Sequence, residues 1–91
     1  MNFVFHTEAR AEFLSAIDYY EGCRLGLGHS FAAEVQSMIE TICSFPGAWP
    51  VLEGDIHRAL IRRFPYGIIY TEEDDVIFVL AIMHLHRDPE Y

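Results

Sequence analysis

The last third of the chain constrains the fold most, because three strand-like runs follow one another closely there. They cover Ile56–Arg63, Gly67–Thr71 and Val76–His84, and they are rich in β-branched and aromatic residues. Glu72–Asp75 predicts a tight acidic turn between the last two runs. The Phe64–Tyr66 corner contains a proline, which cannot donate to a central ladder. The last run is apolar on both faces, which predicts a central strand covered on both sides.

The beginning of the chain predicts a short strand and then a helix. Asn2–His6 is aromatic and β-branched, as strands usually are. Thr7 is the expected N-cap of a helix that runs to Tyr20 or Glu21, and Gly22 is the expected left-handed C-cap residue. One apolar stripe follows the helical period and should face the core: Ala9, Phe13, Ala16, Ile17 and Tyr20.

A second helix is expected from His29 or Ser30 to Phe45, where Pro46 and Gly47 stop it. Its apolar stripe is the clearest in the chain: Phe31, Val35, Met38, Ile39, Ile42 and Phe45. Because the Leu25–Gly28 connection is short, the two helices should form an antiparallel hairpin.

The resulting order, β-α-α-β-β-β, predicts an α+β fold. We expect the helical hairpin to pack on one face of a mainly antiparallel, four-stranded sheet. Pro46–Asp55 is expected to be a loop. With 91 residues, the chain is long enough for one domain, residues 1–91, and too short for two.

Composition narrows the class of protein. Hydrophobic residues make up 52% of the chain, yet no apolar run approaches the roughly 18–20 residues that span a bilayer. The N-terminus lacks the basic, apolar and small-residue regions of a secretion signal, so we expect a cytoplasmic protein. Cys23 and Cys43 should therefore be free thiols, with a disulfide between them as the alternative.

The charge balance is unusual. The chain has 14 acidic residues against 6 basic ones, no lysine, and a formal net charge of −8. A field this acidic disfavours binding to free nucleic acid. Four of the six arginines nevertheless lie after residue 55, which leaves room for a local positive face on an acidic body.

Alternation along the first of the late strands places Arg58, Leu60 and Arg62 on one face. Two or three guanidinium groups on such a face can bind phosphate or carboxylate. The alternative, which alternation alone favours, is that they are surface arginines paired with the excess acids.

His84 and His86 share a face if the last strand extends that far. A zinc site would need a third ligand that no motif supplies, so we predict no metal. His84 could instead transfer protons beside Arg87 and Tyr91, or be a strand-end histidine satisfied by hydrogen bonds.

Several segments together resemble the RelE/ParE toxins of bacterial type II toxin–antitoxin pairs. In chain order, these are Glu8–Phe13, Tyr19–Glu21, Gly26–Gly28, Phe31 with Glu34, Arg58 with Arg62–Tyr70, and Ala81 with His84, Arg87–Pro89 and Tyr91. The resemblance covers essentially the whole chain and keeps the predicted order of elements. It implies a small toxin, without a cofactor, that an antitoxin neutralises by wrapping its surface.

The resemblance implies one of two actions. RelE-like members are metal-independent endoribonucleases that cut messenger RNA on the ribosome. In that case Arg63, His84, Arg87 and Tyr91 would be catalytic: His84 or Tyr91 would handle protons and the arginines would hold phosphate. Glu53 is a further candidate base.

ParE-like members instead inhibit DNA gyrase. RelE-like ribonucleases are usually basic and use lysines, so the acidic, lysine-free composition favours the ParE-like, plasmid-stabilisation branch. Arg58, Arg62, Phe64 and Tyr66 are then the expected contacts with the target or the antitoxin. We expect mainly apolar antitoxin contacts, with carboxylates confined to the arginines. A non-toxic family member is a third alternative.

Overall fold

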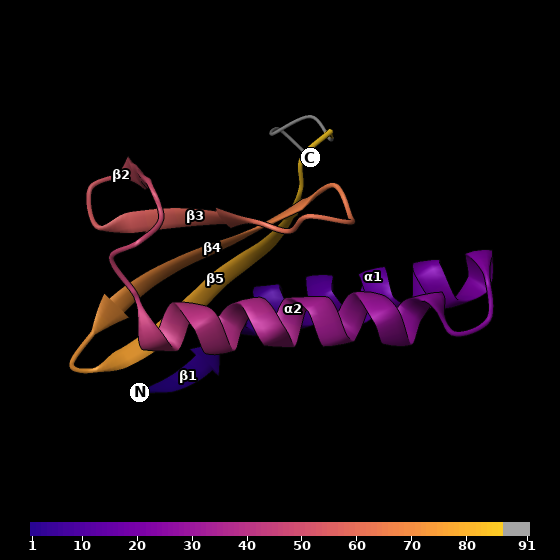
Figure 1. The fold of residues 1–91 in the computed structure, drawn as a ribbon, viewed down its shortest axis with the longest axis horizontal. Helices are drawn as coiled ribbons and strands as arrows, with labels where there is room; N and C mark the ends of the chain where they lie inside the picture. The colour runs from indigo at the N-terminus through magenta and orange to yellow at the C-terminus, as the bar shows by residue number, and fades with distance from the viewer. Residues whose placement is uncertain (87–91) are drawn as a thin grey trace.

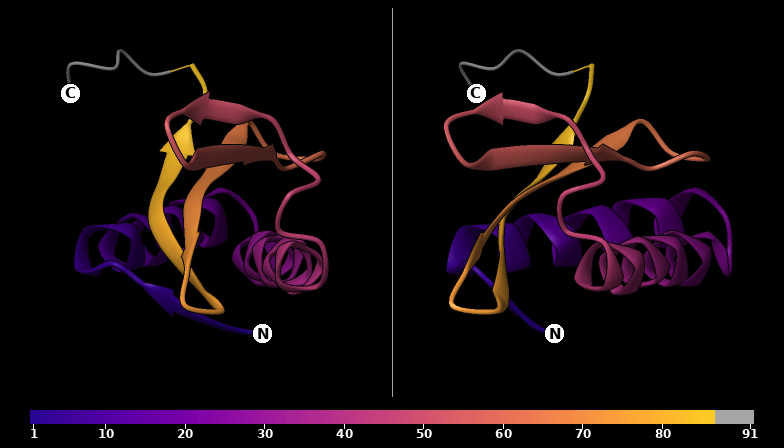
Figure 2. Two further views of the ribbon diagram at one scale, coloured as in Figure 1. Left: turned by 90° about the vertical axis from the view of Figure 1, so that its left-hand side faces the viewer. Right: turned by 60° about the vertical axis from the view of Figure 1, so that its left-hand side comes forward.

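The computed structural model describes residues 1–86 (Figure 1). In chain order, its elements are β1 (Asn2–Phe5), α1 (Thr7–Cys23), α2 (Leu27–Ser44), β2 (Val51–Glu53), β3 (Ile56–Leu60), β4 (Tyr66–Glu73) and β5 (Val76–His84). Two antiparallel helices lie on one face of a twisted sheet (Figures 1 and 2). We call the opposite side of the sheet its outer face. The α+β class and the helical hairpin are confirmed.

The sheet has five strands in the order β1-β5-β4-β3-β2. All neighbouring pairs are antiparallel except β1 and β5, which are parallel. The prediction of four strands is therefore wrong by one. β2 was overlooked because it has three residues, follows Pro50 and ends at the left-handed Gly54 (φ 56°), so its surroundings resemble a loop.

The late strands keep their predicted order, but their boundaries move. β3 ends at Leu60 rather than Arg63, although the Ile61 amide still donates to the Tyr66 carbonyl at 2.9 Å. β4 is longer than predicted because the acidic turn needs only two residues. These are Asp74 (φ 53°) and Asp75 (φ 62°), and left-handed conformations at both positions match the twist of a two-residue hairpin.

The last strand is central in the sheet, as predicted, but it is fully buried on one face only. Ile77, Val79 and Ile82 point into the core, whereas Phe78 and Met83 are half-buried on the outer face. The register shifts opposite Ile69 and Tyr70, where β5 carries one extra residue.

Aromatic contacts connect the helices to the sheet. Phe31 on α2 is fully buried, and its ring lies 5.0–6.1 Å from the rings of Phe13, Tyr20, Phe64 and Tyr66. These separations are typical of favourable edge and tilted ring pairs. Aliphatic residues complete the centre of the core, notably Val35, Ile39, Ile42, Ile68, Ile77 and Val79. The predicted apolar stripes are confirmed except for Phe45, which is 63% exposed at the end of α2.

Both predicted caps of the first helix, Thr7 and Gly22, are wrong. His6 caps α1 in place of Thr7, because its Nδ1 accepts the Glu8 amide at 3.2 Å. α1 continues through Gly22 to Cys23, and the Arg24 amide closes it on the Tyr20 carbonyl. The left-handed glycine of the connection is Gly26 (φ 88°).

Close packing of the two helices explains why α2 already begins at Leu27. A Cβ atom at Gly28 would lie 2.6 Å from the Ile17 carbonyl oxygen, so only glycine allows this approach. The Glu21 carboxylate accepts the amides of Gly26 (2.8 Å) and Gly28 (3.0 Å), which satisfies donors at the start of α2. These bonds, the Gly26 bond foremost, hold the pKa of Glu21 below its ordinary value of 4.5 against the opposing effect of burial.

This cap predicts a pH dependence of stability. A depressed pKa means that the folded state favours the carboxylate. The stabilisation by the Glu21 carboxylate is therefore fully present above pH 4.5. It is lost as the pH falls through the lower pKa that Glu21 has in the folded state. Urea unfolding should show that the advantage of the wild type over Glu21→Gln is smaller at about pH 3 than at about pH 7. Glu40→Gln, on the exposed side of α2, is the matched control. A constant difference between wild type and Glu21→Gln would contradict this role.

The aromatic core predicts a large effect of truncation at its centre. Phe31→Ala should lower the free energy of unfolding by about 3–5 kcal/mol, because it removes a fully buried ring and leaves a cavity. Leu25→Ala should change it by less than about 0.5 kcal/mol, since Leu25 is 92% exposed. Similar effects in chemical denaturation would show that Phe31 does not organise the core.

Candidate interaction surface

Arg58 lies on the outer face, where β3 and β4 pair. Arg58 and Leu60 are exposed, while Ala59 and Ile61 are buried, so the predicted alternation holds along β3. The aliphatic part of Arg58 lies over Gly67: a Cβ atom there would be 3.3 Å from Arg58 Cγ and 3.4 Å from Leu85 Cδ2. Gly67 therefore allows the arginine stem to lie along the sheet.

A groove of about 260 Å³ adjoins Arg58, and we call it the β2 groove. It is lined by Trp49, Pro50, Val51, Leu52, Arg58 and Leu60. Sequence reasoning assigned most of these residues to a loop and missed the groove. The one signal available was the cluster of large apolar side chains beside Pro50, in a segment with no helical or strand period.

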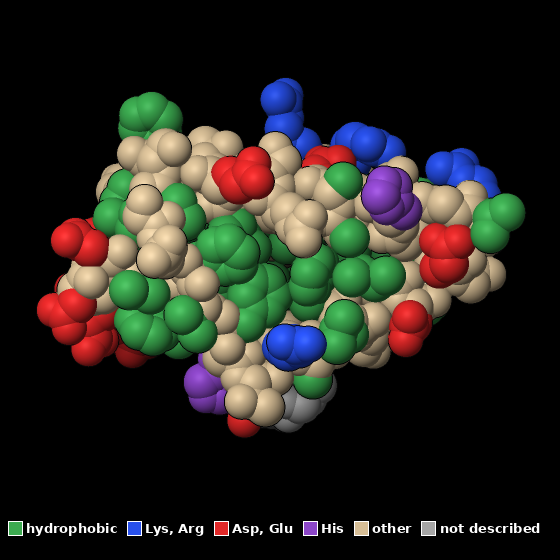
Figure 3. All heavy atoms as spheres, turned by 90° about the horizontal axis from the view of Figure 1, so that it is seen from below, with side chains coloured by type: hydrophobic (Ala, Val, Ile, Leu, Met, Phe, Trp, Pro, Cys, Tyr) green, Lys and Arg blue, Asp and Glu red, His purple; other side chains and the backbone are tan. Residues whose placement is uncertain are grey.

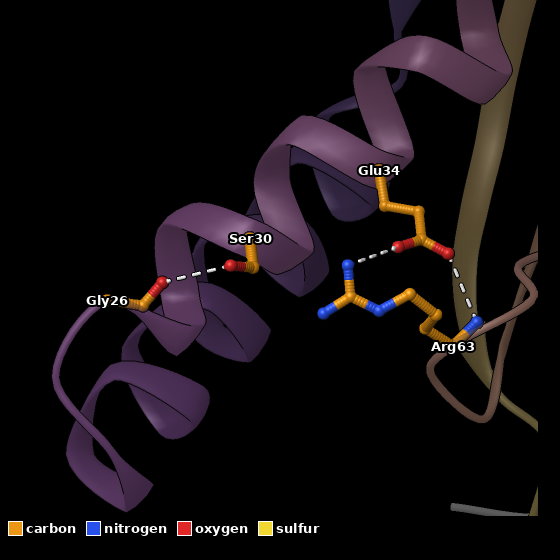
Figure 4. Close-up of polar contacts among 4 residues, drawn as sticks. All are labelled: Gly26, Ser30, Glu34 and Arg63. Atoms are coloured by element: carbon orange, nitrogen blue, oxygen red, sulfur yellow. Dashed lines mark hydrogen bonds and ion pairs between the residues drawn. The ribbon is translucent and has the colours of Figure 1, made fainter.

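Arg62 and Arg63 follow β3 in the corner that leads to β4, and both are exposed. Of the two, Arg63 contacts the helical hairpin, through Glu34. Glu34 of α2 reaches the corner and accepts the Arg63 amide at 3.1 Å, while its other oxygen lies 3.5 Å from the Arg63 guanidinium (Figure 4). Arg63 also lies over the Phe64 ring, 5.6 Å from the centroid. Glu34 thus binds the corner to the helical hairpin, a role that the sequence did not reveal.

Phe64 and Tyr66, which we expected to contact a partner, are 7% and 4% exposed and belong to the core cluster. Their rings contact those of Tyr20 and Phe31. In this structure the two rings pack on the core side of the corner that carries Arg62 and Arg63. Arg58 and Arg62 are the members of the predicted contact set with exposed side chains.

His84 ends β5 and is half-buried. Its ring lies edge-on to the Tyr66 ring at 5.0 Å, and its Nδ1 accepts the His86 amide at 3.1 Å. Because Nδ1 accepts, a neutral His84 carries its proton on Nε2. Arg87 and Tyr91 lie outside the described residues.

Arg63 and His84 each lie against a ring of the aromatic cluster, Arg63 over Phe64 and His84 edge-on to Tyr66. The Tyr20 ring contacts both of these rings, with centroids 4.9 Å from Phe64 and 6.1 Å from Tyr66. Glu53, the further candidate base, is exposed on β2.

Many of the carboxylates belong to the two hairpin turns of the sheet. The β2–β3 turn lies beside β4, since Thr71 Oγ1 donates to the Asp55 carbonyl at 3.1 Å, and the β4–β5 turn follows at the end of β4. Six acidic residues occupy these turns and their flanks: Glu53, Asp55, Glu72, Glu73, Asp74 and Asp75. Figure 3 shows a group of acidic side chains at the left-hand end and others elsewhere on the same face, with hydrophobic side chains across the middle. These turn acids are distinct from Glu34, the acid that contacts the Arg62–Arg63 corner.

Among residues 1–86, no three histidine, cysteine or acidic side chains are arranged to hold a metal ion. Cys23 is exposed at the end of α1 and Cys43 is half-buried on α2, and the two are unpaired. Burial raises the pKa of the Cys43 thiol. Within the described part of the chain, neither helix combines the length and apolar character needed to cross a membrane.

Residues 3–89 match the family described as the ParE toxin of the type II toxin–antitoxin system parDE. This match covers nearly the whole chain, and the chain belongs to that family of toxins. No curated protein matches its sequence.

A solved structure supports the same fold. The chain is similar to one from the chromosomal ParDE toxin–antitoxin system of P. aeruginosa, with a TM-score of 0.68 and 15% identity. The similarity covers 94% of this chain and 97% of the other, so both share the complete arrangement of helices and strands.

The Glu34 contacts predict how the corner is stabilised. Glu34→Ala should lower the free energy of unfolding by about 1 kcal/mol, because it removes the acceptor for the Arg63 amide. Glu34→Gln should cost less than about 0.5 kcal/mol, since an amide oxygen can still accept and an exposed ion pair contributes little. Glu40→Ala controls for removing an acid from α2. Equal losses for Gln and Ala in urea unfolding would mean that the ion pair dominates instead.

Proposed function

We propose that this toxin inhibits bacterial growth by binding a cytoplasmic protein, with DNA gyrase the leading candidate, and that a cognate antitoxin neutralises it. On this proposal it carries out no chemistry of its own. The observation that carries the proposal is the engagement of Arg63 by Glu34, considered together with membership of the ParE family.

The Glu34 contact weighs against cleavage of RNA. A catalytic arginine has to face the phosphate whose charge it stabilises. The Arg63 guanidinium instead lies 3.5 Å from a carboxylate, and that carboxylate would repel a phosphate placed beside it.

The net charge of the chain also weighs against cleavage of RNA. A chain of formal charge −8 approaching ribosomal RNA is opposed by long-range repulsion, which six arginines offset only in part. A protein target imposes no such uniform field. The contact with the target is proposed to include Arg58 and Arg62, whose guanidinium groups can pair with carboxylates of the bound protein.

The antitoxin is the second partner. A type II toxin needs a protein that covers its active surface, and the neighbouring reading frame is where that protein should be encoded. Co-expression of that reading frame should restore growth to cells that express the toxin. If growth stayed arrested while both proteins were present and folded, the assignment of that partner would be wrong.

Expression in bacteria separates the two actions. Wild type should arrest growth, leave cellular transcripts intact, and inhibit DNA supercoiling by purified gyrase. His84→Ala/Arg87→Ala should likewise leave transcripts intact. Codon-dependent cuts that appear with wild type and vanish in this variant would instead establish ribosome-dependent ribonuclease activity. Absence of any growth effect would identify a non-toxic family member.

A further inference from the structure

We propose that the β2 groove is the docking site for one segment of the antitoxin, and that this segment carries a large apolar side chain next to a carboxylate. The apolar side chain fills the groove, and the carboxylate pairs with Arg58. This inference rests on the proposed function, since it specifies how the neutralising partner is recognised.

Three aliphatic side chains of the groove are about half exposed to water. Val51 is 57% exposed, Leu52 is 50% exposed and Leu60 is 49% exposed, and they come from the neighbouring strands β2 and β3. Scattered apolar residues are ordinary on a protein surface, but adjacent ones lining a concave site mark an interaction surface. The groove can therefore accept an apolar side chain and shield its own from water.

Arg58 gives the groove its specificity for a charged group. Among residues 1–86 it is the only charged residue in the lining, and it forms no ion pair there. Its stem rests over Gly67 and beside Leu85, which restricts the positions of the guanidinium before any partner arrives. A restrained guanidinium at the border of an apolar site favours a planar, bidentate carboxylate.

Hydrogen bonds from the sheet hold the groove in shape. The His57 ring Nδ1 lies 2.8 Å from the Trp49 carbonyl oxygen, and the Arg58 amide donates to the Pro50 carbonyl at 3.1 Å. Tyr70 stacks on His57 and donates its hydroxyl to the Pro46 carbonyl at 2.7 Å. Burial raises the pKa of Tyr70 to about 12, so this donor keeps its proton across the physiological range. A site ordered beforehand loses less conformational entropy on binding.

The net charge of the chain favours the antitoxin over a second copy of this chain as the occupant of the groove. Two copies would bring together two bodies of formal charge −8, which opposes self-association. An antitoxin segment needs only one carboxylate at Arg58, with its remaining contacts apolar. Salt should therefore affect the affinity weakly: between about 0.05 M and about 0.5 M NaCl, the dissociation constant should change by less than about tenfold.

Titration calorimetry with the full chain and the protein encoded by the neighbouring reading frame tests this docking. Arg58→Gln and Leu60→Ser should each weaken binding by roughly tenfold or more, as expected for central interface residues. Arg24→Gln and Leu25→Ser are the matched controls. They make the same changes in the exposed α1–α2 connection and should stay within about twofold of wild type. Circular dichroism confirms folding, and Val51→Ser replaces Leu60→Ser if the latter unfolds.

The outcomes separate the docking from the function. If wild type binds tightly but the groove variants bind equally well, the docking is wrong and the proposed function stands. If that protein does not bind wild type at all, the proposed function fails as well.

Two further results would contradict the docking. A wild-type dimer that Leu60→Ser converts to a monomer would make the groove a self-interface. A loss of affinity by orders of magnitude in salt would contradict the apolar character of the groove. Both results overturn the inference.

Discussion

The contact between Phe31 and the aromatic rings around it is the interaction on which the rest of this structure depends. It joins α2 to α1 through Phe13 and Tyr20, and to the β3–β4 corner through Phe64 and Tyr66. Burying these rings contributes a large hydrophobic stabilisation, but that stabilisation does not favour one orientation over another. The preference of aromatic rings for tilted and edge-on contacts fixes how the rings are oriented. The helical hairpin, the corner and the start of β4 are thereby held in one arrangement.

This arrangement leaves the outer face of the sheet uncovered by the two helices (Figures 1 and 2). With the rings of Phe64 and Tyr66 directed into the core, the corner exposes its arginines, and Glu34 restrains Arg63 beside α2. The outer face keeps Arg58 and the half-exposed leucines of β2 and β3. An acidic protein thus presents a small apolar site whose lining includes one guanidinium, that of Arg58, without an ion pair among residues 1–86. Such a surface suits recognition of a protein better than contact with a nucleic acid backbone.

Much of the fold could be predicted from the sequence, because its two periodicities are clean. The stripe from Phe31 to Ile42 specified a helix, and the alternation along β3 specified that Arg58 and Leu60 share a face. The predicted ends of helices and strands were wrong where tertiary contacts override local sequence signals. Gly22 lacks a left-handed conformation because the Glu21 carboxylate and the close approach at Gly28 place the turn later. β2 could not be recognised because three residues beside a proline carry almost no periodic signal.

The candidate site was predictable only in part, since residue type does not reveal which direction a side chain takes. Arg58 and Arg62 are exposed as expected, but Phe64 and Tyr66 point inward, and no pattern linked Glu34 to Arg63, which is 29 positions later. The groove arises from a segment expected to be a loop.

Hydrogen exchange of the free and antitoxin-bound toxin tests most directly whether the outer face is the neutralised surface. We predict that amides of Trp49–Leu60 exchange more slowly in the complex, while those on the exposed side of α1 and α2 are unchanged. Slower exchange confined to the helices, with Trp49–Leu60 unaffected, would contradict it.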